Sequence, residues 1–182
     1  MGADKSVRVD PGARELDGFV VAGILARVIR DLEFDLVLTG VQADDDNLGM
    51  VGIMVAEKLG IGHASVVVGV EPDGDQARVK VELEGGMDEV SNLRLPALLT
   101  VQTGINEPRY VSIMGIRKAR KKELNVIGVE ELGLSEEDLT PMTRIEEVFL
   151  PPETDGAEML EGDSSAVAEQ IIRIIREKGV SI

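Results

Sequence analysis

The sequence predicts an open, mostly parallel α/β sheet of the doubly wound type, with a β-meander inserted into it and an arm plus a helix at the C-terminus. Short apolar runs and helical patterns alternate in residues 6–59, which is typical of parallel strands joined by helices. Three strand-like segments separated by turn residues follow in 63–95 and predict the meander. Residues 141–182 begin without a period and end in an amphipathic pattern. We therefore expect an α/β domain in 1–140 and an arm with a docking helix in 141–182.

The first strand and helix are predicted from alternation and from capping residues. The segment SVRVD alternates like a short strand, and Asp10-Pro11 is typical of an N-cap followed by proline at the first helical position. Apolar residues at three- and four-residue spacing then predict a helix over 12–32. Strand, helix, strand, loop and helix in this order are typical of the middle of a doubly wound sheet, and the first strand is expected at an edge.

The next strand leads into a loop rich in aspartate. DLVLTG, residues 35–40, is a continuous apolar run that ends in glycine, the pattern of a parallel strand buried on both faces. Asn47 is positioned to cap a second helix over 48–59.

The second half of the chain carries the same kinds of signal. The meander strands are expected at 63–71, 77–86 and 87–95. After them we expect a buried strand at 96–104, then a short basic helix, and then a last strand at 123–132. An extended arm at 141–162 and an amphipathic helix at 164–179 complete the prediction. The final helix follows a long arm, so we expect it to dock away from its own core, on the edge of the domain or on a partner.

Composition excludes several classes of function. The chain has 34 acidic residues against 19 Lys and Arg, a net charge of −15, so we expect no nucleic-acid partner and no binding to an anionic membrane. It has no cysteine, which excludes disulfides, thiolate metal sites and cysteine nucleophiles. Its apolar runs are shorter than the ~18 residues of a membrane span, and its first residues lack a signal-peptide core. We predict a soluble, cytoplasmic protein, placed in the mitochondrial matrix if the source is eukaryotic.

The loop GVQADDDNLGMVG, residues 40–52, joins a strand end to a helix N-terminus. Open α/β sheets bind anions at such a point, because unpaired backbone N–H groups meet the positive end of the helix dipole. The residues alone leave two interpretations open: a phosphate site, or a turn in which the aspartates and Asn47 only satisfy local N–H groups. The loop is neither a Walker loop nor GxGxxG, and Leu48 and Val55 stand where an EF-hand needs calcium ligands.

The sequence has no pattern typical of catalysis or of a metal site. The single histidine, His63, opens a strand and has no second His or Cys to complete a metal site. A Ser/His/Asp hydrolase would need His63 together with a GxSxG elbow, which is absent. We predict no catalytic residue and no bound metal.

The segment NEPRYVSIMGIRKARKKE, residues 106–123, differs from the acidic chain around it. An apolar run with Ile113 and Met114 precedes five cations within six residues. The usual meaning of such a charge run is a solvated helix face. An exposed apolar knuckle is costly unless a partner covers it, and methionine suits adaptable contacts, so a partner-binding surface is the second interpretation.

These segments together resemble the β subunit of electron-transfer flavoproteins. MGADKSVRVD, FDLVLTGVQADDDN, LEGGMDEV, LRLPALLTVQTGINEPRYVSIMGIRKARKKE and GAEMLEGDSSAVAEQI occur in the order of that family and cover nearly the whole chain. The resemblance implies an adenine-nucleotide-hydrolase-like α/β fold and a heterodimer with an α subunit that holds most of the FAD site. It also implies an electron carrier and not an enzyme, which takes electrons from flavin dehydrogenases of the acyl-CoA type to an acceptor such as a quinone oxidoreductase.

The resemblance further implies AMP in this subunit, with its phosphate in the aspartate loop. The implied contacts, largely through backbone N–H groups, are Gly40, Gln42, Asp45, Asp46, Asn47, Leu48, Gly49, Met50 and Val51. Electron-bifurcating relatives hold a second FAD here and typically show glycine where Asp46 stands, which favours AMP. The alternative is a bifurcating subunit that binds a second FAD and oxidises NADH, and a third hypothesis is a regulatory nucleotide-binding module.

The basic segment resembles the recognition loop of the family, which binds the dehydrogenases. The implied partner-binding residues are Asn106, Glu107, Pro108, Arg109, Tyr110, Ile113, Lys118, Arg120 and Lys121, with Ile113 as the apolar anchor. Met114 and Gly115 stand where many members have Pro-Asn, which leaves the identity of the partner open. Family members begin with about two further strand–helix units that form the centre of the sheet, so we expect this chain to be a truncated or separately encoded piece.

Overall fold

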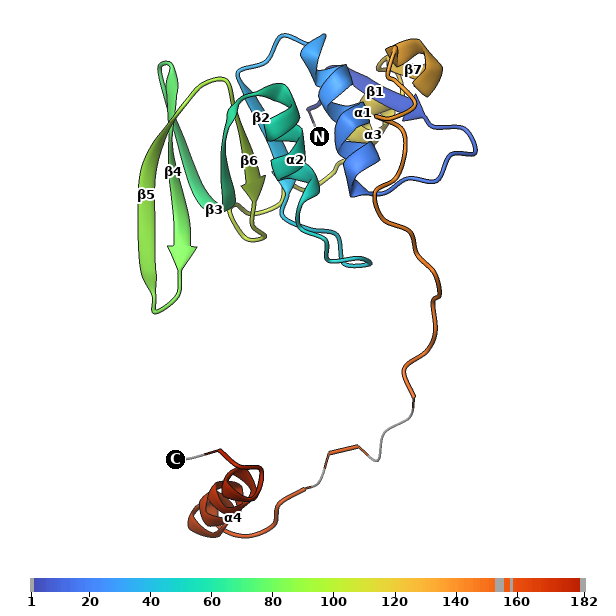
Figure 1. Ribbon diagram of the computed structural model, residues 1–182. Coiled ribbons are helices and arrows are strands. Elements are labelled where there is room, and N and C mark those ends of the chain that lie inside the picture. The colour runs from blue at the N-terminus through green and yellow to red at the C-terminus, as the bar shows by residue number, and fades with distance from the viewer. Residues whose placement is uncertain (1, 153–155, 158, 181–182) are drawn as a thin grey trace. The chain divides into compact units, whose positions relative to one another are not determined.

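The computed structural model describes residues 2–152, 156–157 and 159–180, and the chain divides into two compact units, Met1–Arg144 and Ile145–Ile182. The first unit is an open α/β structure (Figure 1). Its elements are β1 (Ser6–Asp10), α1 (Gly18–Arg30), β2 (Leu36–Gly40), α2 (Val51–Leu59), β3 (Gly62–Asp73), β4 (Gln76–Leu83), β5 (Met87–Arg94), β6 (Ala97–Val101), α3 (Ile113–Ala119), β7 (Leu124–Gly128) and η1 (Val129–Leu132). The predicted α/β fold class is confirmed.

The strands of the first unit form two sheets. The larger sheet has the order β2-β6-β3-β4-β5, and the smaller one pairs β1 with β7. Parallel pairing joins β2, β6 and β3, whereas β3, β4 and β5 follow one another in antiparallel pairs, which confirms the inserted meander. Among the described strands β1 has β7 as its one partner, so it lies at a sheet edge as predicted.

α1 begins at Gly18, later than the predicted start. Asp17, and not Asp10, is the N-cap, and its carboxylate accepts a hydrogen bond from the backbone N–H of Val20 at 2.9 Å. Asp10 instead accepts from the N–H of Gly12 at 3.0 Å, and Gly12 has a φ of +65°, so the chain turns directly after β1. The sequence offers two aspartates that can cap a helix, and this turn leaves the second one to do so.

α1 packs on two sides, against η1 and Leu139 on one side and against α2 and β6 on the other. Its buried Val20 and Ile24 contact η1 and Leu139. Its buried Ala22 and Ala26 belong to a second cluster that contains α2 and β6. Alanine side chains let two helices approach closely, and α1 and α2 do lie side by side (Figure 1). The two helices therefore share one apolar cluster with β6.

α2 begins at Val51, later than predicted, and Asn47 is not its cap. Asn47 has a left-handed φ of +52°, and the N-cap residue is Met50, which makes no side-chain hydrogen bond to the helix. The Asp46 carboxylate accepts from the N–H of Leu48 at 2.9 Å, so this stretch forms a turn of its own. An aspartate that bonds two residues along the chain competes with helix formation at that point.

Two strand predictions are corrected by the structure. β2 is not buried on both faces, since Leu38 is 59% exposed, and the reason is that β2 is the first strand in the order of its sheet. The last strand, β7, ends at Gly128, and the predicted continuation over 129–132 is the 3-10 helix η1. Val129 and Leu132 of η1 are buried against α1, which explains the apolar residues that suggested a longer strand.

β3 changes register beside Thr100 of β6. The shift lies between Ala64 and Val67, and Val66 has a φ of +55°, which is unusual for a β-branched residue. The hydroxyl oxygen of Thr100 accepts a hydrogen bond from the N–H of Val66 at 3.0 Å, and Thr100 is 2% exposed. Thr100 therefore stabilises the bulge in β3.

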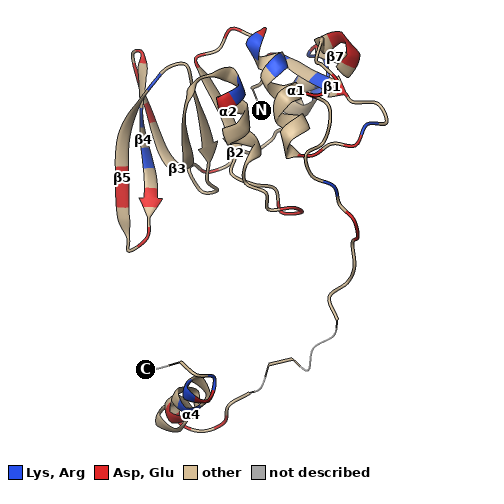
Figure 2. Cartoon of the chain, viewed as in Figure 1, with Lys and Arg blue, Asp and Glu red and all other residues tan. Residues whose placement is uncertain are grey.

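The second unit contains the arm and α4 (Ser164–Glu177). Residues 145–152 have no regular structure, and 153–155 and 158 of the predicted arm lie outside the described residues. The predicted amphipathic helix is confirmed, with Asp163 as its N-cap. Both signs of charge are interleaved along α4 (Figure 2), and none of its residues is buried. Among the helices of the described residues, none is long and apolar enough to cross a membrane.

Candidate functional site

The aspartate loop, residues 41–50, connects the carboxyl end of β2 to α2. β2 and β6 are parallel, so Gly40 and Val101 pair at the same edge of the sheet. A loop at this edge that leads into a helix N-terminus is the usual ligand-binding position of an open α/β sheet. The loop is mostly exposed to solvent, so a ligand has access to it.

The first half of the loop satisfies its own backbone donors. The donor and acceptor pairs are the Asp46 N–H to the Asp45 carboxylate at 3.0 Å, the Asn47 N–H to the Ala43 carbonyl at 3.0 Å and the Leu48 N–H to the Asp46 carboxylate at 2.9 Å. The Gln42 amide also donates to the side-chain oxygen of Asn47 at 3.1 Å. Asp45 and Asp46 therefore stabilise the loop itself, and the N–H groups of Asp46, Asn47 and Leu48, which were predicted to contact the phosphate, already have acceptors.

The second half of the loop leaves its donors free. Among the hydrogen bonds of the described residues, none uses the backbone N–H of any residue from Gly49 to Ile53. Gly49 has a φ of +64°, a conformation that glycine adopts without strain. Because the Met50 N-cap supplies no side-chain acceptor, these N–H groups and the positive end of the α2 dipole can bind an anion.

Gly52 allows α2 to approach the ends of β2 and β6. A Cβ atom at Gly52 would lie 2.5 Å from Oγ1 of Thr39 and 2.9 Å from Cγ2 of Thr100, so only glycine fits. Oγ1 of Thr39 is buried and has no hydrogen-bond partner among the described residues. Such an orphaned hydroxyl is uncommon in a folded protein, and here it lies next to the uncapped helix N-terminus.

Sequence reasoning missed Thr39, Gly52 and Thr100. Their importance comes from contacts between β2, β6 and α2, which lie apart in the sequence. A weak signal was present, since a threonine precedes the strand-ending glycine and a glycine stands second in the helix. Leu48 has a further role, because a Cβ at Gly18 would overlap its side chain, and this contact ties the loop to the start of α1.

The middle of the basic segment forms α3, and its surface is exposed, as both interpretations of this segment require. Ser112 caps the helix and accepts from the N–H of Gly115 at 3.0 Å. None of the helical residues is buried, and Ile113 and Met114 are 72% and 61% exposed. Residues 106–110 have no regular structure, and Tyr110 is 93% exposed.

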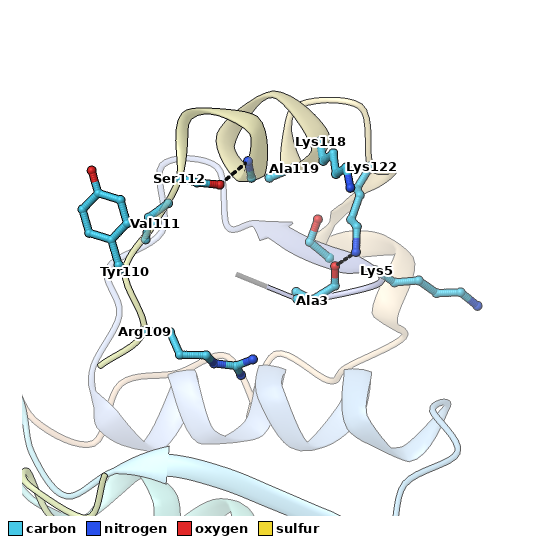
Figure 3. Close-up of a pocket in the computed structure, with 12 residues that line it drawn as sticks. Ala3, Lys5, Arg109, Tyr110, Val111, Ser112, Lys118, Ala119 and Lys122 are labelled. Carbon is cyan, nitrogen blue, oxygen red and sulfur yellow. Dashed lines mark hydrogen bonds between the residues drawn. The ribbon is translucent and has the colours of Figure 1, made fainter. Parts of the chain in front are cut away.

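The two faces of α3 have different surroundings. Ser112, Gly115, Lys118, Ala119 and Lys122 line a cavity of about 410 Å³ together with the residues around β1 and the loop before α3 (Figure 3). At 100° per residue, Ile113, Met114, Arg117, Arg120 and Lys121 fall on the opposite face. Six of the nine predicted partner-binding residues thus separate into two groups: Arg109, Tyr110 and Lys118 border the cavity, and Ile113, Arg120 and Lys121 face away from it. The other three, Asn106, Glu107 and Pro108, are not among the lining residues of this cavity.

Comparison with known proteins decides which family these features belong to. The electron transfer flavoprotein domain matches residues 1–132. The chain belongs to the electron transfer flavoprotein family. The family match includes both the aspartate loop and α3.

Relatives named as β subunits of electron transfer flavoproteins are similar to this chain over nearly its whole length. The electron transfer flavoprotein subunit beta of Methylophilus methylotrophus is 40% identical in an alignment of 182 positions that covers 97% of this chain and 69% of the relative. That of Bacillus subtilis is 34% identical, with 98% and 70% covered. The caffeyl-CoA reductase-Etf complex subunit CarD of Acetobacterium woodii is 32% identical, with 99% and 71% covered. The predicted resemblance is confirmed, and with it the role of an electron-transfer subunit.

Proposed function

We propose that this chain is the β subunit of a heterodimeric electron transfer flavoprotein and that it binds AMP at the N-terminus of α2. The observation that carries the proposal is the run of free backbone N–H groups from Gly49 to Ile53 beside the orphaned hydroxyl of Thr39. A phosphate group supplies the acceptor oxygens and the negative charge that these donors lack. FAD, held mainly by the α subunit, supplies the redox chemistry of the heterodimer.

The free backbone N–H groups indicate which of the predicted nucleotide-binding residues contact the phosphate. The N–H groups of Gly49, Met50 and Val51 are available, so a phosphate binds there without rearrangement of the loop. The carboxylates of Asp45 and Asp46 accept hydrogen bonds from the loop itself, and this engagement limits their competition for the helix end. Gly40 and Gln42 shape the entrance of the loop.

For the dehydrogenase partner, α3 presents Ile113 as an anchor. Ile113 is exposed, and Arg120 and Lys121 share its face of the helix. An apolar side chain of this kind contributes binding energy when a partner covers it, and the cations accelerate encounters with acidic partners. The net charge of −15 repels acidic proteins elsewhere on the surface. Flavin dehydrogenases of the acyl-CoA type, and an acceptor such as a quinone oxidoreductase, are the partners of this proposal.

The arm and α4 are the proposed binding elements for the α subunit. Val148, Phe149 and Leu150 of the arm are 86%, 71% and 92% exposed, and Ile171 of α4 is 44% exposed. Exposure of successive apolar side chains to water raises the free energy of the protein, and burial against another protein lowers it. The opposite charges on the polar face of α4 suit a protein surface better than an anionic membrane.

A second candidate is a subunit of an electron-bifurcating complex that binds a second FAD and oxidises NADH. The relative named as a subunit of a caffeyl-CoA reductase-Etf complex favours it. The flavin content of the purified heterodimer distinguishes the two. One FAD together with one AMP supports the first candidate, and two FAD support the second.

The nucleotide site is tested by co-expression with a candidate α subunit and extraction of the bound nucleotides. Gly52→Ala should lower the AMP content of the complex strongly, because the added methyl group displaces the start of α2. Gly23→Ala is the matched control. It adds the same methyl group to the neighbouring helix, where the nearest atom would be 3.7 Å away, and should leave the AMP content unchanged. Loss of AMP in both variants, or in neither, would contradict the assignment of the site.

The partner surface is tested by the rate at which a dehydrogenase reduces the heterodimer. Ile113→Ala should lower the second-order rate constant about tenfold, as expected for an anchor residue in an interface, and leave the AMP content unchanged. Ile116→Ala removes the same atoms from a less exposed side of α3, 44% exposed, and should have a smaller effect. Equal rates for the wild type and Ile113→Ala would show that the exposed isoleucine is not the anchor.

A further inference from the structure

The cavity behind α3 has a wall of cations. Four of its lining residues are basic, Lys5, Arg109, Lys118 and Lys122, and none of the lining residues is acidic. Acidic residues outnumber basic ones by 34 to 19 in the chain, so this wall has the opposite character to the surface as a whole. The cavity therefore forms a region of positive potential on an acidic protein.

The cations of this wall differ in their availability. Lys122 donates to the carbonyl of Ala3 and forms an ion pair with Asp4 at 3.2 Å. Among the ion pairs of the described residues, none involves Arg109 or Lys118. Arg109 lies across the cavity from Lys118 and Lys122, whereas the Lys5 ammonium points away (Figure 3). Two cations that have no acidic partner in the described part of the chain thus face one cavity from opposite sides.

We propose that this cavity binds a small organic anion that carries a phosphate or carboxylate group on an apolar body. The guanidinium of Arg109 offers paired donors that match either group, and Lys118 adds a second charge. Val111 and Ala119 supply apolar contacts between the cations. A volume of about 410 Å³ is within the range of small-molecule sites. A docking protein is disfavoured as the occupant, because Ile113 and Met114 are on the other face of α3.

Binding in the cavity would also stabilise α3. The helix has seven residues and none of them is buried, so it has few contacts of its own with the rest of the unit. A ligand between Arg109 and the Lys118 side of the helix adds contacts that exist only when the helix is folded. Amide hydrogen exchange in residues 113–119 should therefore slow when the cavity is filled.

The experiment uses the full chain and the fluorescence of Tyr110, which borders the cavity and is the single tyrosine of a chain without tryptophan. Cyclohexyl phosphate and cyclohexanecarboxylate are the probes, since neither absorbs where tyrosine does. Each should change the fluorescence of Tyr110 in a saturable way. Inorganic phosphate should bind several times more weakly, and cyclohexanol should give no saturable change.

Two arginine variants distinguish binding in the cavity from a general attraction of anions to the positive charge of the basic segment. Arg109→Gln should raise the dissociation constant of both probes about tenfold. Arg117→Gln removes the same charge from the opposite face of α3 and should change it less than about twofold. Equal effects of the two variants, equal binding of inorganic phosphate and the cyclohexyl probes, or no saturable change with either probe would overturn the proposal.

Discussion

Replacing Asp17 with alanine should release two segments of the first unit at once. One carboxylate oxygen accepts from the N–H of Val20 at 2.9 Å and caps α1. The other oxygen accepts from the N–H of Met142 at 2.7 Å, from the N–H of Thr143 at 2.9 Å and from the Thr143 hydroxyl at 3.2 Å. Asp17 therefore holds both the start of the first helix and the chain just before the second unit, which begins at Ile145.

The size of the effect follows from these bonds. Loss of an N-cap side chain costs about 1 kcal/mol. The bonds from Met142 and Thr143 to a charged acceptor add about 1–2 kcal/mol together, because the site is partly exposed and water replaces part of what is lost. We expect Asp17→Ala to lower the free energy of unfolding by about 2–3 kcal/mol. Asp10→Ala removes one local bond, from Gly12, and should cost less than about 1 kcal/mol.

Urea unfolding at neutral pH measures both variants, and limited trypsin digestion gives a local readout. Cleavage after Arg144 should be faster in Asp17→Ala, since residues 142–143 are no longer fixed to α1, and unchanged in Asp10→Ala. If the two variants lose the same stability, or if cleavage after Arg144 is equally fast in both, the carboxylate of Asp17 does not fasten the chain.

The pH dependence of the same contact has a definite sign. Desolvation raises the pKa of Asp17, but hydrogen bonds from Val20, Thr143 and Met142 outweigh it and hold the pKa below its ordinary value. The stabilisation is therefore fully present above the unfolded pKa of about 3.9 and is lost as the pH falls through the folded pKa. The stability difference between the wild type and Asp17→Asn should be constant from pH 7 to about 5 and shrink below about pH 4. A constant difference in the acid range would contradict this account.

Three further substitutions test the core and the edge of the proposed nucleotide site, all by urea unfolding of the full chain. Thr39→Val should leave the free energy of unfolding unchanged or raise it, because it removes a buried hydroxyl that has no partner. Thr100→Val, the same exchange on the neighbouring strand, should lower it by about 1–3 kcal/mol, because the N–H of Val66 loses its acceptor. Leu98→Ala should lower the free energy of unfolding by about 2–5 kcal/mol, since the Leu98 side chain of β6 is fully buried against α1 and α2.

The strands of the larger sheet could be predicted because their signals are local. The apolar run in 96–104 is β6, and its first residues are buried as expected. The turns of the meander are marked by Gly74, Gly85 and Gly86, each of which has a positive φ that favours glycine. The final helix was equally clear, because an apolar stripe at helical spacing needs no information from elsewhere in the chain.

The starts of α1 and α2 could not be predicted from residue types alone, because hydrogen bonds elsewhere decide which residue caps the helix. Asp10 and Asp17 both fit an N-cap in sequence, but only Asp17 also accepts hydrogen bonds from the N–H groups of Met142 and Thr143. These two residues lie more than a hundred positions further along the chain, so no local pattern indicates the contact. Near α2, Asn47 is a good cap by residue type, yet the turn made by Asp46 removes it from the helix. The burial of β2 was overestimated for a related reason, since its apolar pattern does not reveal its place in the sheet order.

The sequence predicts the aspartate loop but not its contact with Thr39 through Gly52, and the charges of the loop affect the free N–H groups at that contact. A loop with three successive carboxylates is at first sight unsuited to an anion. Two of them, Asp45 and Asp46, accept hydrogen bonds from N–H groups of the first half, so their charge stabilises the turn and the donors from Gly49 to Ile53 stay free. Gly52 then brings these donors against the orphaned hydroxyl of Thr39, through a packing contact that no local pattern reveals. The phosphate site that we propose at α2 therefore requires the hydrogen bond from the Leu48 N–H to the Asp46 carboxylate, because a released carboxylate would compete for the same helix N-terminus.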